Sequence, residues 1–212
     1  MYDFCYVTKK EAAPLKEDIK ELLYLVQDEV KQHFTFRFDP VGSSSRNMIT
    51  YDRNDNIGFD FDFNIEPNDP KEKFNAYEIR NIIYEAIRKH YKTFGYTNIE
   101  NSTSVITVKA VDRYRRKIKY SCDFAIVHNF TDNGKRVQQY IRYNKGNNTY
   151  SWNLRGKGFF IDEKIKWLKA HKHWNDLLDY YIEKKNNNDN PDKHSKSILA
   201  ESVNEQYRKY HG

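Results

Sequence analysis

The chain has 212 residues, of which 38% are hydrophobic and 31% are charged. This length fits one large domain or a catalytic domain with an annex. The 17 Tyr and 13 Phe residues supply apolar area for a core, which excludes a chain that is disordered by composition. No stretch is apolar enough to span a bilayer or to form a signal-peptide core, so we expect a cytoplasmic protein without a membrane partner. Cys5 and Cys122 match no metal or redox spacing, and we expect reduced thiols.

The net charge of +6 is unevenly distributed. Residues 1–100 carry 14 Lys and Arg against 18 Asp and Glu, a balance of −4, whereas residues 101–212 carry 22 against 12, a balance of +10. A half this basic favours phosphate-rich partners such as a nucleotide or a nucleic acid, although lysines exposed to solvent are an alternative explanation. The candidate phosphate contacts are Arg115, Arg116, Lys157 and Lys166.

The first part of the chain predicts a helix, a strand, a turn and a second strand. Apolar residues recur at spacings of three and four from about residue 10 to residue 34, which is typical of an amphipathic helix. Residues 35–41 alternate as in a strand, and the small-residue sequence GSSSRNMI that follows is a turn that can open a helix. Residues 57–65 form a second predicted strand with strict alternation.

Pro70 suits the first turn of a long helix, which we expect to run to about Thr93 and to end at Gly95. Three strands are expected next. They are residues 104–111, 117–128 and 136–143, and Asn133-Gly134 predicts a hairpin between the last two.

The stretch NKGNNTYSWNLRGKG is expected to be irregular and to lead into helices. These helices should run from residue 161 to about 185, with a final helix near residues 197–210. The order of elements predicts an α+β fold with a mixed β-sheet flanked by helices. We expect a core at residues 1–160 and a short C-terminal helical extension at residues 161–212.

Two carboxylates share one face of the predicted strand FDFDF. Because side chains alternate, the Phe rings should face the core while Asp60 and Asp62 face the other side, roughly 6 to 7 Å apart at the backbone. Like charges at this spacing repel each other, and a divalent cation such as Mg²⁺ would reverse that penalty. The alternative is an ordinary strand whose polar face lies in solvent.

Two further segments bear on this choice. In Gly42-Ser43-Ser44-Ser45, glycine and small residues leave backbone N–H groups and hydroxyls available to a phosphate, although such turns are common on surfaces. Asp123 stands in an otherwise apolar strand, so it is expected either to bind a metal or to pair with a buried arginine.

A strand, a Gly-Ser turn, a strand with two Asp, a helix and a later strand with a third Asp together resemble the DNA polymerase beta-like nucleotidyltransferase superfamily. The resemblance covers about residues 35–128 and is closest to the branch that contains the oligoadenylate and cyclic-dinucleotide synthetases. Two features depart from the pattern of many members. Eighteen positions separate Gly42 from Asp60, and Arg46-Asn47 stands where many members have a second glycine.

The resemblance implies a nucleotidyltransferase-type fold and the transfer of a nucleoside monophosphate from an NTP to a hydroxyl acceptor. The acceptor can be a nucleotide, an RNA, a protein or a small molecule. It also implies that two Mg²⁺ or Mn²⁺ ions are bound by the catalytic residues Asp60, Asp62 and Asp123. The implied nucleotide-binding residues are Gly42, Ser43, Ser44, Ser45 and Arg46.

Two other functions remain open from the sequence. One is a catalytically silent nucleotide- or RNA-binding protein of the same fold, and the other is a basic RNA-binding or toxin–antitoxin partner. Aromatic residues interleaved with basic ones could stack on a base or could belong to the core. They are Tyr140, Tyr143, Tyr150 and Trp152.

Overall fold

The structure is a computed structural model that describes residues 2–54, 58–69, 72–156, 161–190, 193 and 195–212. The chain divides into two compact units. The larger unit comprises Val7–Thr50 and Asn56–Arg155, and the smaller comprises Met1–Tyr6, Tyr51–Asp55 and Gly156–Gly212. The smaller unit therefore joins N-terminal residues to the C-terminal helices, an association that local sequence patterns do not reveal.

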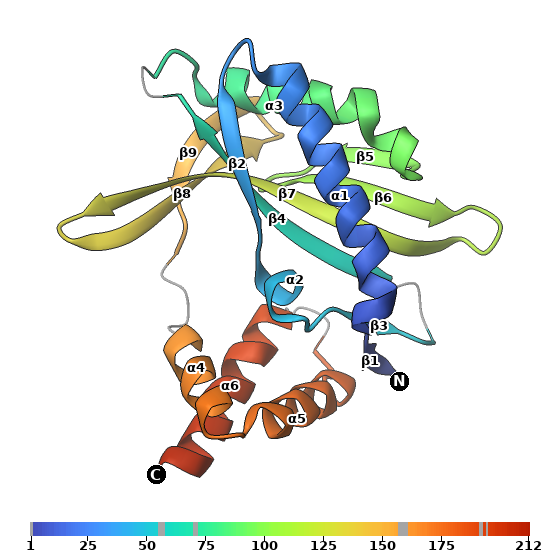
Figure 1. Cartoon of the computed structure of the whole chain (residues 1–212), viewed down its shortest axis with the longest axis vertical. Coiled ribbons are helices and arrows are strands. Elements are labelled where there is room, and N and C mark those ends of the chain that lie inside the picture. Colours follow the sequence, from blue (N-terminus) through green and yellow to red (C-terminus); the bar gives the residue numbers. More distant parts are fainter. Residues whose placement is uncertain (1, 55–57, 70–71, 157–160, 191–192, 194) are drawn as a thin grey trace. The chain divides into compact units, whose positions relative to one another are not determined.

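The larger unit is built on a mixed sheet with the strand order β2-β4-β7-β6-β5, and β8 pairs with both β7 and β9 (Figure 1). Its strands are β2 (Thr35–Pro40), β4 (Phe59–Asn68), β5 (Asn98–Asn101), β6 (Ile106–Asp112), β7 (Lys117–Asp132), β8 (Lys135–Asn144) and β9 (Thr149–Leu154). β4 and β7 are parallel, and the other pairs are antiparallel. The prediction of an α+β fold with a mixed sheet flanked by helices is confirmed.

Two helices, α1 (Lys9–Val30) and α3 (Ala76–His90), lie side by side over this sheet (Figure 1). The prediction that the second helix begins near Pro70 is wrong, since α3 begins at Ala76; Pro70 itself lies outside the described residues. Asn75 accepts a hydrogen bond from the Glu78 N–H, and the Glu78 side chain accepts one from the Asn75 N–H. This capping box satisfies N–H groups at the helix start, so it fixes where α3 begins. A short 3-10 helix, η1 (Tyr91–Phe94), then leads to Gly95.

Aromatic rings fill the space between the sheet and the helices. Phe61 and Phe63 on β4 are fully buried, as is Phe124 on β7. Arg80 of α3 is also buried, and its guanidinium donates to the Asn101 side chain and to the carbonyls of Ile141, Ser102 and Val105. Because each buried donor finds an acceptor, Arg80 ties α3 to β8 and to the loop after β5 without an unpaired polar group.

The two hairpins at the end of the sheet differ in how well the sequence predicts them. Asn133 and Gly134 adopt φ values of 48° and 76° between β7 and β8, which confirms that hairpin. The prediction of an irregular stretch after residue 143 is wrong, because Thr149–Leu154 forms β9 along β8. The neighbouring glycine and asparagine residues favour a loop by local propensity, but pairing with β8 in the tertiary structure makes this segment a strand.

The smaller unit contains β1 (Phe4–Tyr6) and residues 51–52 of β3 (Thr50–Asp52), and β1 and β3 pair as a two-stranded sheet. Its helices are α4 (Ile161–Ala170), α5 (Trp174–Asn186) and α6 (Ser195–His211). β1 is attached to α5, since the Phe4 N–H donates to Asn186 Oδ1 at 2.6 Å and the Tyr6 hydroxyl donates to the Leu178 carbonyl at 2.9 Å. Among the helices described, none has the length and apolar character needed to cross a membrane.

Candidate functional site

The small-residue turn after β2 forms the one-turn helix α2 (Gly42–Arg46), which confirms that this turn opens a helix. The backbone N–H and carbonyl of Asp62 are both hydrogen-bonded to this turn or to the residue just before it. The Val41 N–H donates to the Asp62 carbonyl at 2.9 Å, and the Asp62 N–H donates to the buried hydroxyl of Ser44, also at 2.9 Å. The turn and the second Asp of the DxD pair are therefore held together as one element.

Gly42 makes the closest approach between the turn and the carboxylates. Its φ is +59°, a conformation that glycine adopts without steric cost. A Cβ atom at this position would lie 3.1 Å from Asp62 Oδ2, so a larger residue would press on the carboxylate. Glycine is therefore required both by the backbone conformation and by the space beside Asp62.

The three serines of α2 have different surroundings. Ser44 is buried and holds the Asp62 N–H, and the Ser45 hydroxyl donates to the Gly42 carbonyl at 3.0 Å. The Ser43 hydroxyl makes no hydrogen bond within the described part of the chain, and the residue is partly exposed. Ser43 is thus the serine whose hydroxyl is available to a ligand.

Two cations lie near the turn or near Asp62, and the sequence did not predict that either reaches this site. Lys16 of α1 donates to the Ser44 carbonyl at 3.0 Å and to Asn47 Oδ1 at 3.3 Å. Arg155, directly after β9, donates to Gln138 Oε1 at 2.7 Å and lies close enough to Asp62 for their charges to interact. Neither belongs to a local motif, because each reaches the site from a distant part of the chain.

The three predicted carboxylates meet on adjacent parallel strands. In the register of β4 and β7, Asp62 stands opposite Asp123 and Asp60 stands opposite Ser121. Phe61 and Phe63 alternate with them and are buried, whereas Asp60 is exposed and Asp62 is half-buried. The carboxylates therefore share the face of the sheet opposite the aromatic core.

The first and third carboxylates each have a hydroxyl neighbour. Asp60 Oδ1 accepts a hydrogen bond from Ser121 Oγ at 2.8 Å, and Asp123 Oδ1 accepts one from Thr107 Oγ1 at 2.6 Å. Thr107 stands opposite Asp123 on β6, so three neighbouring strands contribute to the cluster.

Burial and like charge shift the acidity of this cluster. Burial, and after it the nearby charges of Asp60 and Asp123, raise the pKa of Asp62 to about 7, while the charge of Arg155 opposes them. Burial also raises the pKa of Asp123, against the opposing effects of the Thr107 hydrogen bond and the Lys109 charge. Both shifts show that the fold holds negative charge here at a cost.

The residues present fit divalent cations. All three side chains offer hard oxygen ligands, their mutual repulsion would be relieved by positive charge, and Gly42 leaves the space beside Asp62 without a side chain. With the side chains as they stand, no three His, Cys, Asp or Glu residues in the described ranges converge into a metal site. Asp60 and Asp123 are instead turned toward Ser121 and Thr107.

The aromatic residues considered for base stacking lie in and beside the β8–β9 hairpin. Tyr143 and Tyr150 stack on each other with centroids 4.5 Å apart, and Trp152 packs edge-on against His128. Tyr140 faces the guanidinium of Arg155, 5.9 Å from its ring centroid. Tyr140 is therefore the member of this group that is linked, through Arg155, to Asp62.

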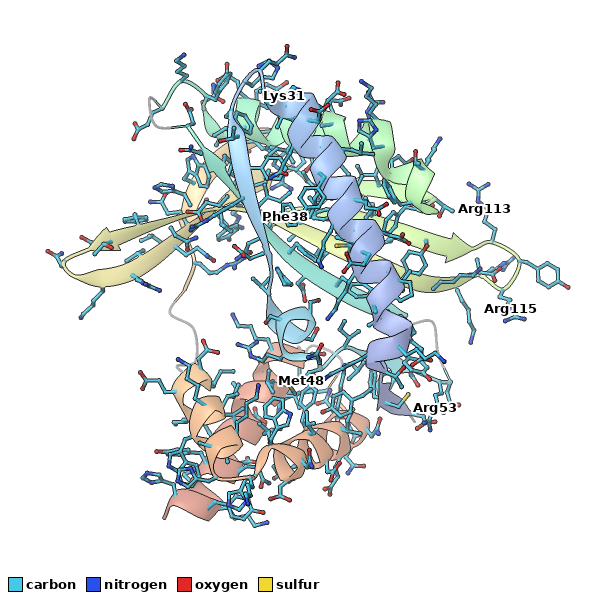
Figure 2. All side chains as sticks on the ribbon, viewed as in Figure 1. Lys31, Phe38, Met48, Arg53, Arg113 and Arg115 are labelled. Atoms are coloured by element: carbon cyan, nitrogen blue, oxygen red, sulfur yellow. The ribbon has the colours of Figure 1, made fainter. Side chains whose placement is uncertain are left out.

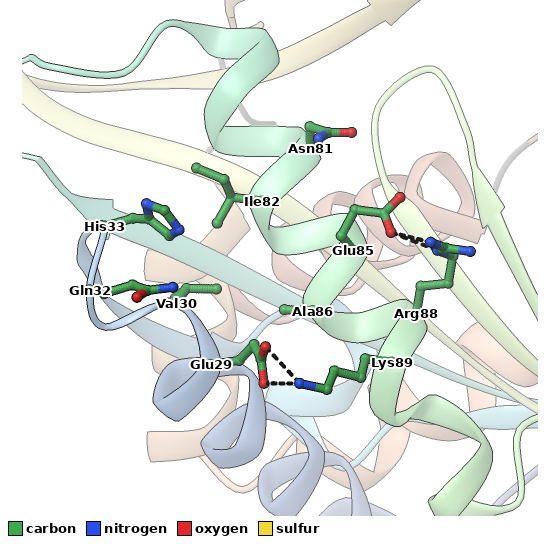
Figure 3. Close-up of a pocket in the computed structure, with 10 residues that line it drawn as sticks. All are labelled: Glu29, Val30, Gln32, His33, Asn81, Ile82, Glu85, Ala86, Arg88 and Lys89. Atoms are coloured by element: carbon green, nitrogen blue, oxygen red, sulfur yellow. Dashed lines mark hydrogen bonds and ion pairs between the residues drawn. The ribbon is translucent and has the colours of Figure 1, made fainter.

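A separate cavity of about 590 Å³ lies between the C-terminal end of α1 and α3 (Figure 3). Its charged side chains are already paired, Glu29 with Lys89 and Glu85 with Arg88. It contains none of the predicted site residues, so the candidate site is the carboxylate face of β4 and β7 and not this cavity.

No protein-family model and no curated protein sequence matches the chain. Solved structures do match it. CdnE cyclic dinucleotide synthase of Elizabethkingia meningoseptica, solved with GTP and Apcpp, is 13% identical with a TM-score of 0.54 over 92% of this chain and 70% of its own. The GTP-bound form of Vibrio cholerae DncV is 14% identical with a TM-score of 0.57, over 93% of this chain and 52% of its own. Escherichia coli DncV with 3'-deoxy GTP is 16% identical with a TM-score of 0.56, over 98% of this chain and 55% of its own.

The chain thus spans about half the length of the two DncV proteins. At these identities the likeness is one of fold. The chain has the fold of these cyclic dinucleotide synthases, as the resemblance of the Gly-Ser turn and the three Asp residues predicted.

Proposed function

We propose that the larger unit is a metal-dependent nucleotidyltransferase that moves a nucleoside monophosphate from an NTP to a hydroxyl acceptor. The observation that carries the proposal is the register of Asp62 with Asp123, with Asp60 on the same face and the Gly42–Arg46 turn bonded to Asp62. The fold shared with proteins solved with GTP or its analogues supports an NTP as the donor. The acceptor can be a nucleotide, an RNA, a protein or a small molecule.

Asp60, Asp62 and Asp123 would hold two Mg²⁺ or Mn²⁺ ions. Bound there, the ions would lower the pKa of the acceptor hydroxyl and neutralise charge on the triphosphate. Asp123 is the candidate group to accept the proton of the acceptor hydroxyl. To bind metal, the Asp60 and Asp123 carboxylates must turn from their hydroxyl partners, Ser121 and Thr107.

The turn would position the triphosphate beside the carboxylates. Ser43 contributes its available hydroxyl, and Gly42 allows close approach of the ligand to the backbone. Ser44 acts through Asp62, because its hydroxyl is committed to the Asp62 N–H. Ser45 and Arg46 donate to the Gly42 carbonyl and would stabilise the conformation of the turn. Phosphoryl transfer depends mainly on such positioning and on charge neutralisation.

A catalytically silent protein of the same fold is the second candidate. Its supporting observation is that no three acidic side chains converge on a common point within the described residues. The argument against it is that the repulsion among three carboxylates on one face lowers the stability of the protein. A protein without catalytic activity would be more stable if it lost them.

The test incubates the protein with each labelled NTP and Mg²⁺ or Mn²⁺, with total RNA, purified protein or no acceptor. We expect label transfer that Asp60→Asn, Asp62→Asn and Asp123→Asn each reduce roughly 100-fold or more, a loss of the size seen when an electrostatic catalytic group is removed. Asp132→Asn is the matched control. It lies on the same strand as Asp123, nine residues further on, and is exposed.

Calorimetry and the transfer assay together separate the two candidates. The enzyme requires that the affinity for NTP depend on the divalent ion and exceed the affinity for NMP. Binding that survives excess EDTA, or transfer that all three Asn variants retain, would overturn the proposal. Metal-dependent NTP binding without transfer to any acceptor would favour the silent protein.

A further inference from the structure

The turn between β6 and β7 presents three arginines and a tyrosine to solvent. Its residues, Arg113-Tyr114-Arg115-Arg116, are all exposed, and the Tyr114 side chain is 96% accessible. Arg113 and Arg115 project from the tip of the β6–β7 hairpin (Figure 2). We call residues 113–116 the arginine turn. An aromatic ring this exposed buries no apolar area within the fold, so packing does not explain it.

The backbone of the arginine turn is held in one conformation. Asp112 Oδ1 accepts hydrogen bonds from the Tyr114 N–H at 3.1 Å and from the Arg115 N–H at 3.0 Å. Arg116 completes the turn in the left-handed region with φ 53°. Ordering a loop in advance lowers the entropic cost of binding through its side chains.

The guanidinium groups of the arginine turn are unpaired within the described part of the protein. None of its three guanidinium groups makes a hydrogen bond or ion pair with any described residue. Asp112, the acid beside them, instead binds the turn backbone and lies 3.8 Å from Lys119 Nζ. The hydrogen bond from the Arg115 N–H, and to a lesser extent the charge of Arg115, lower the pKa of Asp112, but all three guanidinium groups remain available to an anionic partner.

The same two strands connect the arginine turn to the carboxylates. Lys117, the first residue of β7, directly follows the arginine turn, and Asp123 lies six residues further along the strand. At the rise per residue of a strand, the backbone distance between Lys117 and Asp123 is about 20 Å. Two cations lie between them. Lys109 stands opposite Ser121, interacts electrostatically with Asp123 and pairs with Glu100 at 2.7 Å. The exposed Lys119 lies at the irregularity in the β6–β7 pairing. A linear anion can therefore contact the arginine turn and the carboxylate face together.

We propose that the arginine turn binds single-stranded nucleic acid whose end serves as the hydroxyl acceptor. Arginine forks bind phosphate oxygens, and an exposed aromatic ring stacks on bases whatever their sequence. An acidic protein or an anionic membrane would use the charges but would have no specific use for one isolated tyrosine ring. The assignment of the bound strand as acceptor rests on the proposed function, whereas the binding itself does not.

The experiment measures the affinity for a labelled 12-nucleotide RNA by fluorescence anisotropy from about 25 to 300 mM salt. The logarithm of the binding constant falls linearly with the logarithm of the salt concentration, and each lost phosphate contact makes this slope shallower by about 0.7 for single strands. Arg115→Gln/Arg116→Gln should flatten the slope by about 1.4, and Arg115→Lys/Arg116→Lys should restore it. Tyr114→Ala should weaken binding roughly tenfold without changing the slope, because it removes stacking and no charge. Arg88→Gln, an exposed arginine on α3, should change neither quantity.

Several outcomes would overturn the proposal. They are no RNA binding at low salt, full affinity in the turn variants, or tighter binding to polyglutamate or to phosphatidylserine vesicles than to RNA. Asp60→Asn should retain RNA binding, and the turn variants should retain metal-dependent NTP binding. If the wild-type protein binds RNA but transfers no label, the result counts against the proposed enzyme alone. If the wild-type protein binds NTP with metal but does not bind RNA, the result counts against the arginine turn alone.

Discussion

The two faces of β4 and β7 are made from alternating residues of the same strands but meet opposite physical demands. Phe61 and Phe63 are fully buried against helices, where apolar burial stabilises the fold. Asp60 and Asp62 lie on the other face, where their charges repel each other and that of Asp123. One face therefore supports the structure, while the other holds a strained cluster in place. Stability that is lost at one surface and supplied at another is typical of functional sites.

The largest effect on stability should come from the aromatic face. Phe63→Ala removes a ring that packs against Phe38 and Phe124, so we expect a loss of about 3 to 5 kcal/mol in the free energy of unfolding. Denaturant unfolding monitored by circular dichroism measures it. Phe63→Leu, which keeps most of the apolar volume, should lose less than half as much. Equal losses in the two variants would show that Phe63 does not lie in a close-packed core.

A smaller effect is expected where the turn touches the carboxylate face. Gly42→Ala imposes a left-handed φ on alanine and places its Cβ 3.1 Å from Asp62 Oδ2. Gly134→Ala is the matched control, since Gly134 has a similar φ of +76° but no atom within 4 Å of an added Cβ. Both should lose about 1 kcal/mol of stability from backbone strain. Only Gly42→Ala should also weaken metal-dependent NTP binding, measured by calorimetry, and equal binding in the two variants would show that the Gly42–Asp62 approach is irrelevant to the ligand.

The sequence predicted the two faces well because alternation in a strand is a local property. Asp60 and Asp62 had to face away from Phe61 and Phe63 once the strand formed. The resemblance implied that Asp123 acts with Asp60 and Asp62, but the parallel pairing of β4 with β7 that places Asp123 opposite Asp62 was not predicted. Ser44 could not be separated from Ser43 beforehand, because only the fold shows that the Ser44 hydroxyl is bound to the Asp62 N–H.

The errors have the same origin. Arg155 and Lys16 reach the site from remote segments, so no spacing in the sequence connects them to Asp62 or to the turn. β9 lies among glycines and asparagines that favour loops, yet pairing with β8 makes it a strand. Lys157, a predicted phosphate contact, lies outside the described residues, and Lys166 belongs to α4 of the smaller unit.

The smallest effect is the most specific to the carboxylate face, and it has a defined pH dependence. The pKa of Asp62 is raised to about 7 in the folded protein, whereas an unfolded Asp titrates near 3.9. Between these values the folded state binds more protons than the unfolded state, so the stability of the wild type should fall from about pH 4 to pH 7 and level off above it.

The variant Asp62→Asn removes the charge at nearly constant volume and should abolish this fall in stability. At pH 7.5 the variant should be more stable than the wild type by about 1 kcal/mol, less than the full pKa shift would give, because Asp62 is partly exposed and water screens the repulsion. Thermal melts across this pH range, with and without Mn²⁺ and NTP, measure both the gain and its reversal, since the ligands should stabilise only the wild type. Asp132→Asn should follow the wild type throughout. A variant that melts below the wild type without metal, and responds to Mn²⁺ as the wild type does, would make Asp62 a structural residue.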